Sequence, residues 1–495
     1  MHFKKIKPYK INGSVSIFIS LILVLLLTTI FIVFDSARSV SQKTVLADIS
    51  DISSKSLAGS YCYELLNDYG IFAINTSDIN TEDALKKYTA TNLLKLGMLS
   101  TSLKSVSISN VTYLNDNDGI LFSQQIISLM KYMEVKNIKD MISRDLNLKN
   151  NLASIDVYDV TNTKSDMFNS LSTNSNSLYQ LSDEDVEDDK DDSGLRFFDL
   201  LKEKVRILLN DNLMITLFED TSSLSNKTID KAVLPSMTTS FSAKETAIYE
   251  EYIEDPNPSI SSERIWFTEY ISMFFSNYLQ PSKDGGLSYE IEYIINGAET
   301  DHKNLYSTMI KLIALRSSFN ACHILSSSEK LNALKNLAQT LSANTPVAYT
   351  FVETTLLSIW SICESIIDVK DLVHGKKVQI IKDDSHWTLS LDNILTLNNS
   401  TLSVNDGKYG FSYDYYLKLL LTAQKELTLR FRTLDLIQTN ICNKYNNTFR
   451  ISNCICSYDA AFIYNCNYLF IDNIPLSGFV LPSEFCFNTH YTYSK

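Results

Sequence analysis

The clearest hydrophobic pattern in this chain lies within its first sixty residues. Residues 15–34 read VSIFISLILVLLLTTIFIVF, an apolar run without a charged side chain. A helix of about 20 residues covers the ~30 Å hydrocarbon core of a bilayer, so the run predicts a transmembrane helix. A cleaved signal sequence is the alternative, because the small residues Ala37 and Ser39 follow, but its apolar region is usually about 7–15 residues long.

The helical pattern continues beyond this run into a polar segment. Small or apolar residues recur at helical intervals over 35–66, and the segment contains no proline. We therefore expect one helical unit over 13–66, a transmembrane helix with an exterior extension. A half-polar helix of this kind must pack one stripe on something. The pattern fits both the first helix of an ordinary domain and a packing helix for a partner subunit.

The charges that flank the run predict its orientation. Asp35 follows the run directly, and four lysines precede it: Lys4, Lys5, Lys7 and Lys10. Positive residues are retained in the cytoplasm, so we expect 1–12 to be a cytoplasmic tail and the bulk of the chain to be extracellular. A second apolar run, 351–369, carries Glu353, Glu364 and Asp368. Such charges cost about 2.5–3.5 kcal/mol each near a bilayer centre, so we predict a single crossing.

Beyond residue 66 the pattern predicts two exterior modules and a linker. Residues 67–160 form the first α+β module, with these expected elements: strands at 70–74 and 105–113, helices at 82–96 and 121–145. Residues 161–194 are acidic and polar with few apolar side chains to bury, which predicts a solvated linker. A calcium loop at 183–187 is the alternative, but the stretch lacks the central Gly and closing Glu of an EF-hand.

Residues 195–495 form the second module, which we expect to be mainly helical. Apolar residues recur at helical spacing in five segments: 265–278, 304–325, 329–341, 351–369 and 413–440. Short β-type runs lie between 378 and 404, and the aromatic, β-branched C-terminal part predicts a hairpin that turns near 458–461. The predicted fold class is α+β, dominated by helices.

Composition limits the partners of the chain. Its 495 residues suffice for two or three domains with their own cores. The net charge of −13 argues against nucleic acid, which requires clustered Lys and Arg. The membrane bilayer is the partner that the apolar run predicts, and the sequence indicates no small-molecule ligand.

A search for catalytic, cofactor and metal sites finds none to predict. The sequence has no G-x-S-x-G, H-E-x-x-H, P-loop or G-x-G-x-x-G motif. Cys322 and His323 are adjacent and point about 100° apart on a helix, which makes a poor chelate. Glu290 with Glu292, and Glu353 with Glu364, are carboxylate pairs more typical of caps or ion pairs than of a glycosidase site. We expect no enzyme activity, no cofactor and no metal; an anchored hydrolase is the least favoured hypothesis.

The eight cysteines are unevenly spaced, and five of them fall after residue 441. Their spacing does not match a zinc site, so we expect structural thiols or disulfides. In the predicted hairpin, Cys466 lies opposite Cys454 or Cys456, depending on where the turn is centred. Opposed residues approach to Cα separations of about 4.5–5.5 Å, whereas a separation above about 7 Å excludes a disulfide.

The first sixty residues resemble tight-adherence (Flp) pilus-assembly proteins of the TadE/TadG type. The residues that carry this resemblance are a Gly13-Ser14 step, the apolar run, Asp35-Ser36-Ala37-Arg38 and a helix ending Leu57-Ala58-Gly59-Ser60. The remainder resembles a family of uncharacterised surface proteins from clostridial-type Gram-positive bacteria that has no assigned activity. Five blocks support this resemblance: 63–74, 124–133, 287–305, 362–391 and 413–441.

One position departs from the pilin pattern. Pilin precursors are cut after a Gly, and the mature protein then has Glu at its fifth position. With Gly13 as the cut site, Phe18 occupies that position. The resemblance therefore implies a membrane-anchored accessory or minor pilin-like protein, with pilus or secretion-apparatus proteins as partners. An extracellular ligand-binding or sensing module is the alternative function.

Overall fold

The computed structural model describes residues 13–98, 100–133, 193–210, 213–218, 220–237, 262–343, 349–394, 409–470 and 483–493. The chain divides into two compact units. Unit 1 comprises residues 1–67, 71–116 and 450–495, and unit 2 comprises 68–70 and 117–449. The sequence places 450–495 in the second module, but this segment belongs to unit 1, to which it contributes two strands. Most of the predicted linker, 161–192, lies outside the described residues.

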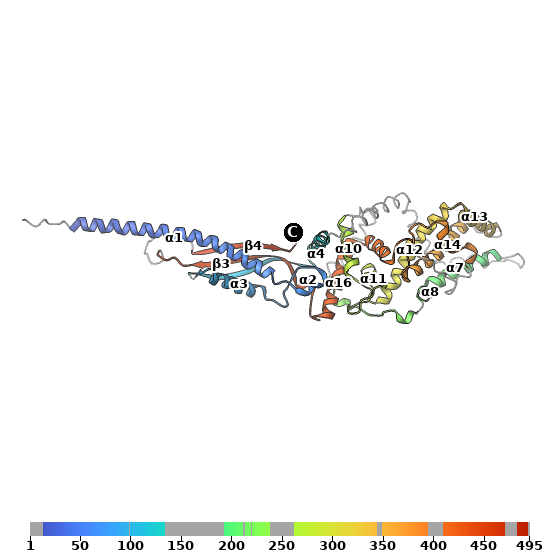
Figure 1. The fold of residues 1–495 in the computed structure, drawn as a ribbon, viewed down its shortest axis with the longest axis horizontal. Helices are drawn as coiled ribbons and strands as arrows, with labels where there is room; N and C mark the ends of the chain where they lie inside the picture. The colour runs from blue at the N-terminus through green and yellow to red at the C-terminus, as the bar shows by residue number, and fades with distance from the viewer. Residues whose placement is uncertain are drawn as a thin grey trace, which may run out of the picture. The chain divides into compact units, whose positions relative to one another are not determined.

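Unit 1 is a long helix packed on an antiparallel sheet (Figure 1). Its helices are α1 (Gly13–Ala58), α2 (Tyr63–Tyr69, whose last residues fall in unit 2) and α3 (Thr81–Lys95). Its strands are β1 (Ile74–Asn75), β2 (Thr101–Tyr113), β3 (Cys454–Cys466) and β4 (Glu484–Thr492). β3 is central, with β2 along one side and with β1 and β4 along the other.

The core of unit 1 lies between this sheet and the second half of α1. Alternate residues of β3, among them Tyr458, Phe462 and Tyr464, are buried together with Leu46 and Ile49 of α1. Figure 1 shows the second half of α1 running beside the sheet while its first half extends beyond it. The helix ends at Ala58, earlier than predicted, where Gly59 and Ser60 begin a turn. The predicted strand at 70–74 is reduced to the two residues of β1.

The predicted turn at 458–461 is wrong, because these residues lie within the continuous strand β3. The side chains on both faces of β3 favour an extended backbone through these residues. Tyr458 and Ala460 point into the core. Asp459 lies on the other face, where it accepts hydrogen bonds from Asn110 Nδ2 at 2.7 Å and pairs with His490 Nδ1 at 2.6 Å.

Unit 2 is helical. Its helices are α4 (Ile120–Tyr132), α7 (Ser193–Asn210), α8 (Leu213–Leu217), α10 (Ser262–Phe274), α11 (Glu290–Asn296), α12 (Asp301–Ser326), α13 (Ser328–Ala343), α14 (Tyr349–Val373), α15 (Tyr413–Thr422) and α16 (Glu426–Lys444). α12 and α14 pack extensively on each other, and α13 and α11 pack against this pair. The β-type runs predicted between 378 and 404 are not strands in the part that the structure describes; Val378 forms only an isolated bridge with Phe411. Together the two units confirm the predicted helix-dominated α+β class.

α14 is the second helix that is long and apolar enough to cross a membrane, and 67% of its most apolar window is buried within the protein. Its charged residues Glu364 and Asp368 are buried as well. α14 is therefore packed as a core helix of unit 2, and the single crossing stays a prediction.

Candidate functional site

The first half of α1 is an exposed apolar surface. Val15, Leu25 and Val33 have 57%, 63% and 67% of their surface exposed, and none of the most apolar window of this helix is buried. Contiguous apolar surface of this extent is not stable against water and marks a contact with lipid or protein. The N-terminal helix therefore fits a membrane anchor or a signal sequence.

The second half of α1 is fixed to the sheet by packing and by hydrogen bonds. Leu46 and Ile49 are fully buried. Ser50 Oγ lies 2.9 Å from Tyr464 Oη, and Tyr458 Oη donates to the carbonyl of Ser54 at 2.7 Å. Buried hydroxyl groups need such partners, so the two tyrosines fix the position of α1 along β3.

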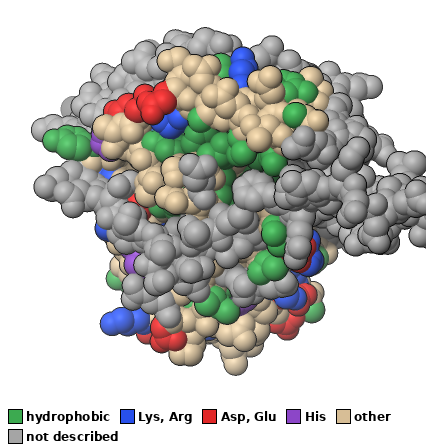
Figure 2. Space-filling model, turned by 90° about the vertical axis from the view of Figure 1, so that its right-hand side faces the viewer, with side chains coloured by type: hydrophobic (Ala, Val, Ile, Leu, Met, Phe, Trp, Pro, Cys, Tyr) green, Lys and Arg blue, Asp and Glu red, His purple; other side chains and the backbone are tan. Residues whose placement is uncertain are grey.

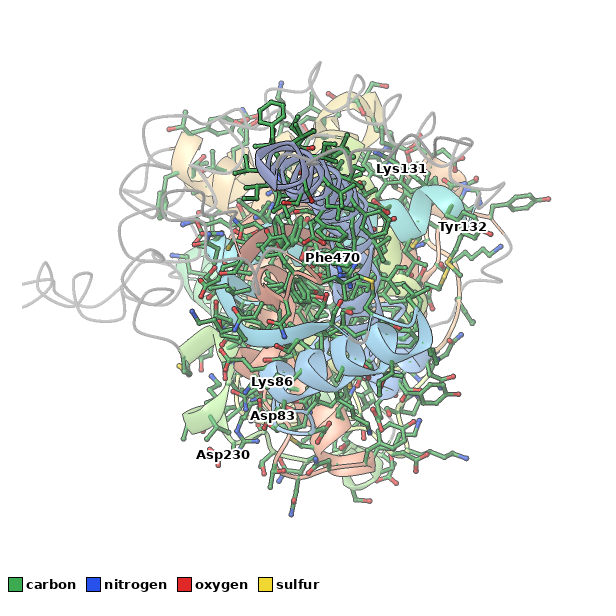
Figure 3. The ribbon with its side chains drawn as sticks, turned by 90° about the vertical axis from the view of Figure 1, so that its left-hand side faces the viewer. Asp83, Lys86, Lys131, Tyr132, Asp230 and Phe470 are labelled. Carbon is green, nitrogen blue, oxygen red and sulfur yellow. The ribbon has the colours of Figure 1, made fainter. Side chains whose placement is uncertain are left out.

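A polar junction separates the two halves of α1. Asp35 is 1% exposed, and its Oδ2 accepts a hydrogen bond from the backbone N–H of Phe470 at 3.0 Å. The Phe470 ring stacks on Phe31 with centroids 4.4 Å apart, and it lies beside α1 in Figure 3. One turn after Asp35, Arg38 donates to Ser100 Oγ. The sequence indicates Asp35 only as the charge that follows the run and, together with Arg38, as part of the pilus resemblance, since nothing local connects these residues to residues 100 and 470.

Unit 2 contains a fully buried cluster of four charges. Arg316 Nε donates to Asp368 Oδ2 at 2.9 Å, and Lys382 Nζ contacts Asp368 Oδ1 at 2.5 Å and also pairs with Glu364. Burial by itself would raise the pKa of Asp368, but the charges of Arg316 and Lys382 overcome this effect and lower it. Each of these side chains is at most 5% exposed.

This buried charge cluster has further partners in the backbone. Glu364 accepts hydrogen bonds from the N–H groups of Thr388 and Leu389, at 3.0 and 2.9 Å, and Arg316 Nη1 donates to the carbonyl of Ile380 at 2.7 Å. The cluster therefore holds the segment 380–389 against α12 and α14. Two cations balance two carboxylates without exposure to solvent, so the arrangement is suited to holding the fold. The i, i+4 spacing of Glu364 and Asp368 in an apolar helix was the sequence signal for this cluster.

A less buried group lies beside the cluster. Asp384 pairs with Lys330 and lies 3.1 Å from His323 Nε2. The ring of Trp387 lies 5.3 Å from the His323 ring and 5.2 Å from Lys330 Nζ. His323 therefore faces Asp384 and Trp387. In the part of the chain that the structure describes, no group of three or more His, Cys, Asp or Glu could hold a metal ion.

Glu290 and Glu292 lie in the short helix α11 and bind different parts of the chain. Glu290 Oε2 accepts hydrogen bonds from the backbone N–H and Oγ of Ser276, at 2.8 and 2.7 Å. Glu292 Oε1 accepts from Tyr413 Oη at 2.6 Å and from the N–H of Tyr278 at 2.9 Å. Burial raises the pKa of Glu290, and it raises the pKa of Glu292 to about 7. Both carboxylates fasten loops to α11 and are enclosed by the protein.

Glu353 and Glu364, the second carboxylate pair from the sequence, differ in environment. Glu364 belongs to the buried charge cluster, whereas Glu353 is partly exposed near the start of α14. Three turns of helix separate them, so they do not converge on one site.

Figure 2 views unit 2 from one end and shows hydrophobic side chains between charged ones on that face.

The predicted pairing of Cys466 is wrong. Cys454 and Cys466 are the two ends of the single strand β3, which places them about 40 Å apart at ~3.3 Å per residue. Cys456 is about 33 Å from Cys466 by the same measure, so both separations exclude a disulfide. The register places Thr101 opposite Cys466 and Asn75 opposite Cys454. All eight cysteines lie within the described residues, and no disulfide bond joins any two of them.

Comparison with known proteins gives one family match. The model of a family of unknown function, DUF5702, matches residues 198–466. No curated protein and no solved structure matches the chain. The family match begins after the N-terminal helix, so the pilus resemblance of the first sixty residues stays a prediction. The match spans more than half of the sequence, and the protein therefore belongs to the DUF5702 family.

Proposed function

We propose that this protein is a membrane-anchored, extracytoplasmic structural protein, a minor pilin-like component of a tight-adherence pilus or a related secretion apparatus. The observation that carries the proposal is the division of α1 into two halves. Its first half presents apolar side chains outward, and its second half is buried on a sheet. One continuous helix thus joins a membrane-length segment to a folded unit without a flexible linker.

The direct connection supports a structural role. A helix that continues from the bilayer into the core of unit 1 transmits position and force between them, because its backbone hydrogen bonds are uninterrupted. The hydrogen bonds of Ser50 and Ser54 to tyrosines of β3 fix this connection. The buried charges of unit 2 are likewise engaged in holding helices and loops together, which favours a scaffold over an enzyme.

Two sequence features support the finer parts of the proposal. The lysines before the run favour a cytoplasmic N-terminus, which would place both units outside the cell. Phe18, where the pilin pattern has Glu, is 65% exposed on α1. An apolar residue there cannot neutralise the N-terminus of a neighbouring subunit, so a minor or accessory subunit is favoured over a major one.

The anchor is tested by placing a charge in each half of α1. Leu25→Arg puts a cation at the centre of the run, at a cost of about 2.5–3.5 kcal/mol in a bilayer. Ile52→Arg is the matched control, because Ile52 is 47% exposed on the other half of the same helix. We expect Leu25→Arg to reduce the membrane-bound fraction and Ile52→Arg to leave it unchanged. Release of the wild-type protein from membranes by alkaline carbonate, which extracts peripheral proteins and leaves spanning helices in place, would refute the anchor.

The sidedness and the pilus role need separate measurements. Protease treatment of intact cells should remove both units and leave a fragment that contains residues 4–34; a full-length, protected protein would refute the topology. Deletion of the protein should reduce the filaments sheared from the cell surface, and wild-type protein should restore them. Normal filaments in the deletion strain would refute the pilus role while leaving the anchor untouched.

A further inference from the structure

The turn that follows β3 reaches the apolar half of α1. Phe470 stacks on Phe31, with rings 4.4 Å apart and 7° from parallel, and meets Phe34 edge-on at 5.8 Å. Both phenylalanines of α1 belong to the apolar run 15–34. Phe31 lies about 4–5 Å inside the end of this run, at ~1.5 Å per helical residue. A part of unit 1 thus overlaps the membrane-length segment.

Hydrogen bonds fix the position of this turn along the axis of α1. The backbone N–H of Phe470 binds Asp35, and the N–H of Asn467 donates to the carbonyl of Ser100 at 3.0 Å. Ser100 is itself bound by α1, through Arg38 and through Gln42 Nε2 at 3.2 Å. These contacts tie both ends of residues 467–470 to the polar junction of α1, so the turn cannot slide toward the tip of the sheet.

The side chains at this position suit a lipid interface. Leu469, which directly precedes Phe470 in the chain, is 50% exposed. Phe and Leu side chains partition favourably into the hydrocarbon of a bilayer, and Arg side chains just outside it extend toward the headgroups. Phe31, Phe34 and Phe470 lie on the apolar side of the junction, and Arg38 lies about one helical turn beyond Asp35.

We propose that Leu469 and Phe470 are inserted into the lipid interface on the unit 1 side of the bilayer. Unit 1 then rests directly on the membrane surface, with Asp35 and Arg38 at headgroup level. This inference depends on the proposed anchoring by α1 and adds a second contact with lipid. The occupant is the bilayer because Phe470, the neighbour of the exposed Leu469, packs on Phe31 and Phe34 of the apolar run that α1 presents to it.

Depth-dependent fluorescence quenching tests the proposal with the full-length protein in phosphatidylcholine vesicles. The lipids carry bromine either near the headgroup or deep in the acyl chain. Three single substitutions supply the probes: Leu469→Trp at the turn, Leu25→Trp in the run, and Ile52→Trp on the second half of α1. The replaced residues are exposed to similar extents, 50%, 63% and 47%, so each Trp fits without repacking the core. The wild-type signal is subtracted, since its three Trp residues lie in unit 2.

We expect deep bromines to quench Leu25→Trp most strongly. Shallow bromines should quench Leu469→Trp several-fold more than they quench Ile52→Trp. Quenching of Leu25→Trp together with a Leu469→Trp signal equal to that of Ile52→Trp would overturn this inference and leave the anchor intact. A blue-shifted but unquenched Leu469→Trp would also overturn it, because another protein surface would then cover the turn. Absence of quenching for Leu25→Trp would instead refute the anchor itself.

Discussion

Glu292 allows the sharpest test of how buried charge acts in unit 2. The side chain is fully buried on α11, and its Oε2 has no hydrogen-bond partner among the described residues. Groups of three other residues act on the Glu292 carboxyl: the hydroxyl of Tyr413, the N–H of Tyr278 and the like-charged Asp301. Burial raises the pKa of Glu292 to about 7, from an ordinary value of 4.5. We consider the isosteric variant Glu292→Gln, which cannot ionise.

The direction of the pH effect follows from the higher pKa in the folded chain. A carboxyl group that binds its proton more tightly when folded contributes full stability below about pH 4.5, and this stability is lost as pH rises through about 7. At about 1.4 kcal/mol per pKa unit, the loss is about 3 kcal/mol above pH 7. Glu292→Gln should therefore gain about 3 kcal/mol relative to wild type between pH 4.5 and pH 8.

The stability difference between Glu292→Gln and wild type has two opposing contributions at each pH. The amide keeps the acceptor for Tyr413 Oη but adds a buried N–H that finds no partner, which costs about 1–3 kcal/mol at every pH. We therefore expect the variant to be slightly less stable than wild type near pH 5 and more stable at pH 8. Burial also raises the pKa of Asp435 to about 6. This group changes the stability of both proteins with pH by the same amount, so its contribution cancels in the comparison.

Urea unfolding of the full chain in detergent, followed by Trp fluorescence, measures this difference. Trp266, Trp360 and Trp387 all lie in unit 2, so the signal reports the unit that contains Glu292. Glu299→Gln is the matched control, because Glu299 is exposed just after α11. A stability difference between Glu292→Gln and wild type that is equal at pH 5 and pH 8 would refute the reasoning.

Two further predictions concern unit 2. Gly297 ends α11 with φ +69°, and an added Cβ would lie 2.6 Å from Arg432 Nε, so Gly297→Ala should lose about 1–3 kcal/mol in urea unfolding. Gly375 has φ +79° with nothing within 4 Å, so Gly375→Ala should lose less; equal losses would exclude the clash. Lys382→Met leaves two buried carboxylates with one cation and should cost about 3–5 kcal/mol by the same assay. Arg206→Met, at the exposed ion pair with Glu203 on α7, should change little, and an equally small effect at Lys382 would contradict the role of the cluster.

The cysteines show how a local pattern can mislead. The aromatic and β-branched residues correctly indicated β structure after residue 446, but the hairpin turn predicted near 458–461 does not exist. Asp459 is instead satisfied by Asn110 and His490 on neighbouring strands, 349 and 31 residues away. Asn110 and His490 can be recognised as partners of Asp459 only once β2 and β4 are paired with β3. The predicted opposition of Cys466 failed for this reason.

The sequence by itself determined the elements that depend on neighbouring residues. The apolar run over 15–34 and the 3.6-residue periodicity of segments such as 304–325 and 329–341 led directly to α1, α12 and α13, because helical hydrogen bonds and side-chain faces are set within a few residues. The tertiary structure decided which strands pair, and it brought residues 316, 364, 368 and 382 into one buried cluster. It also decided that residues 450–470 fold against α1, more than 400 residues away. Strand pairing and charge burial depend on contacts between distant segments, and a local pattern cannot specify those contacts.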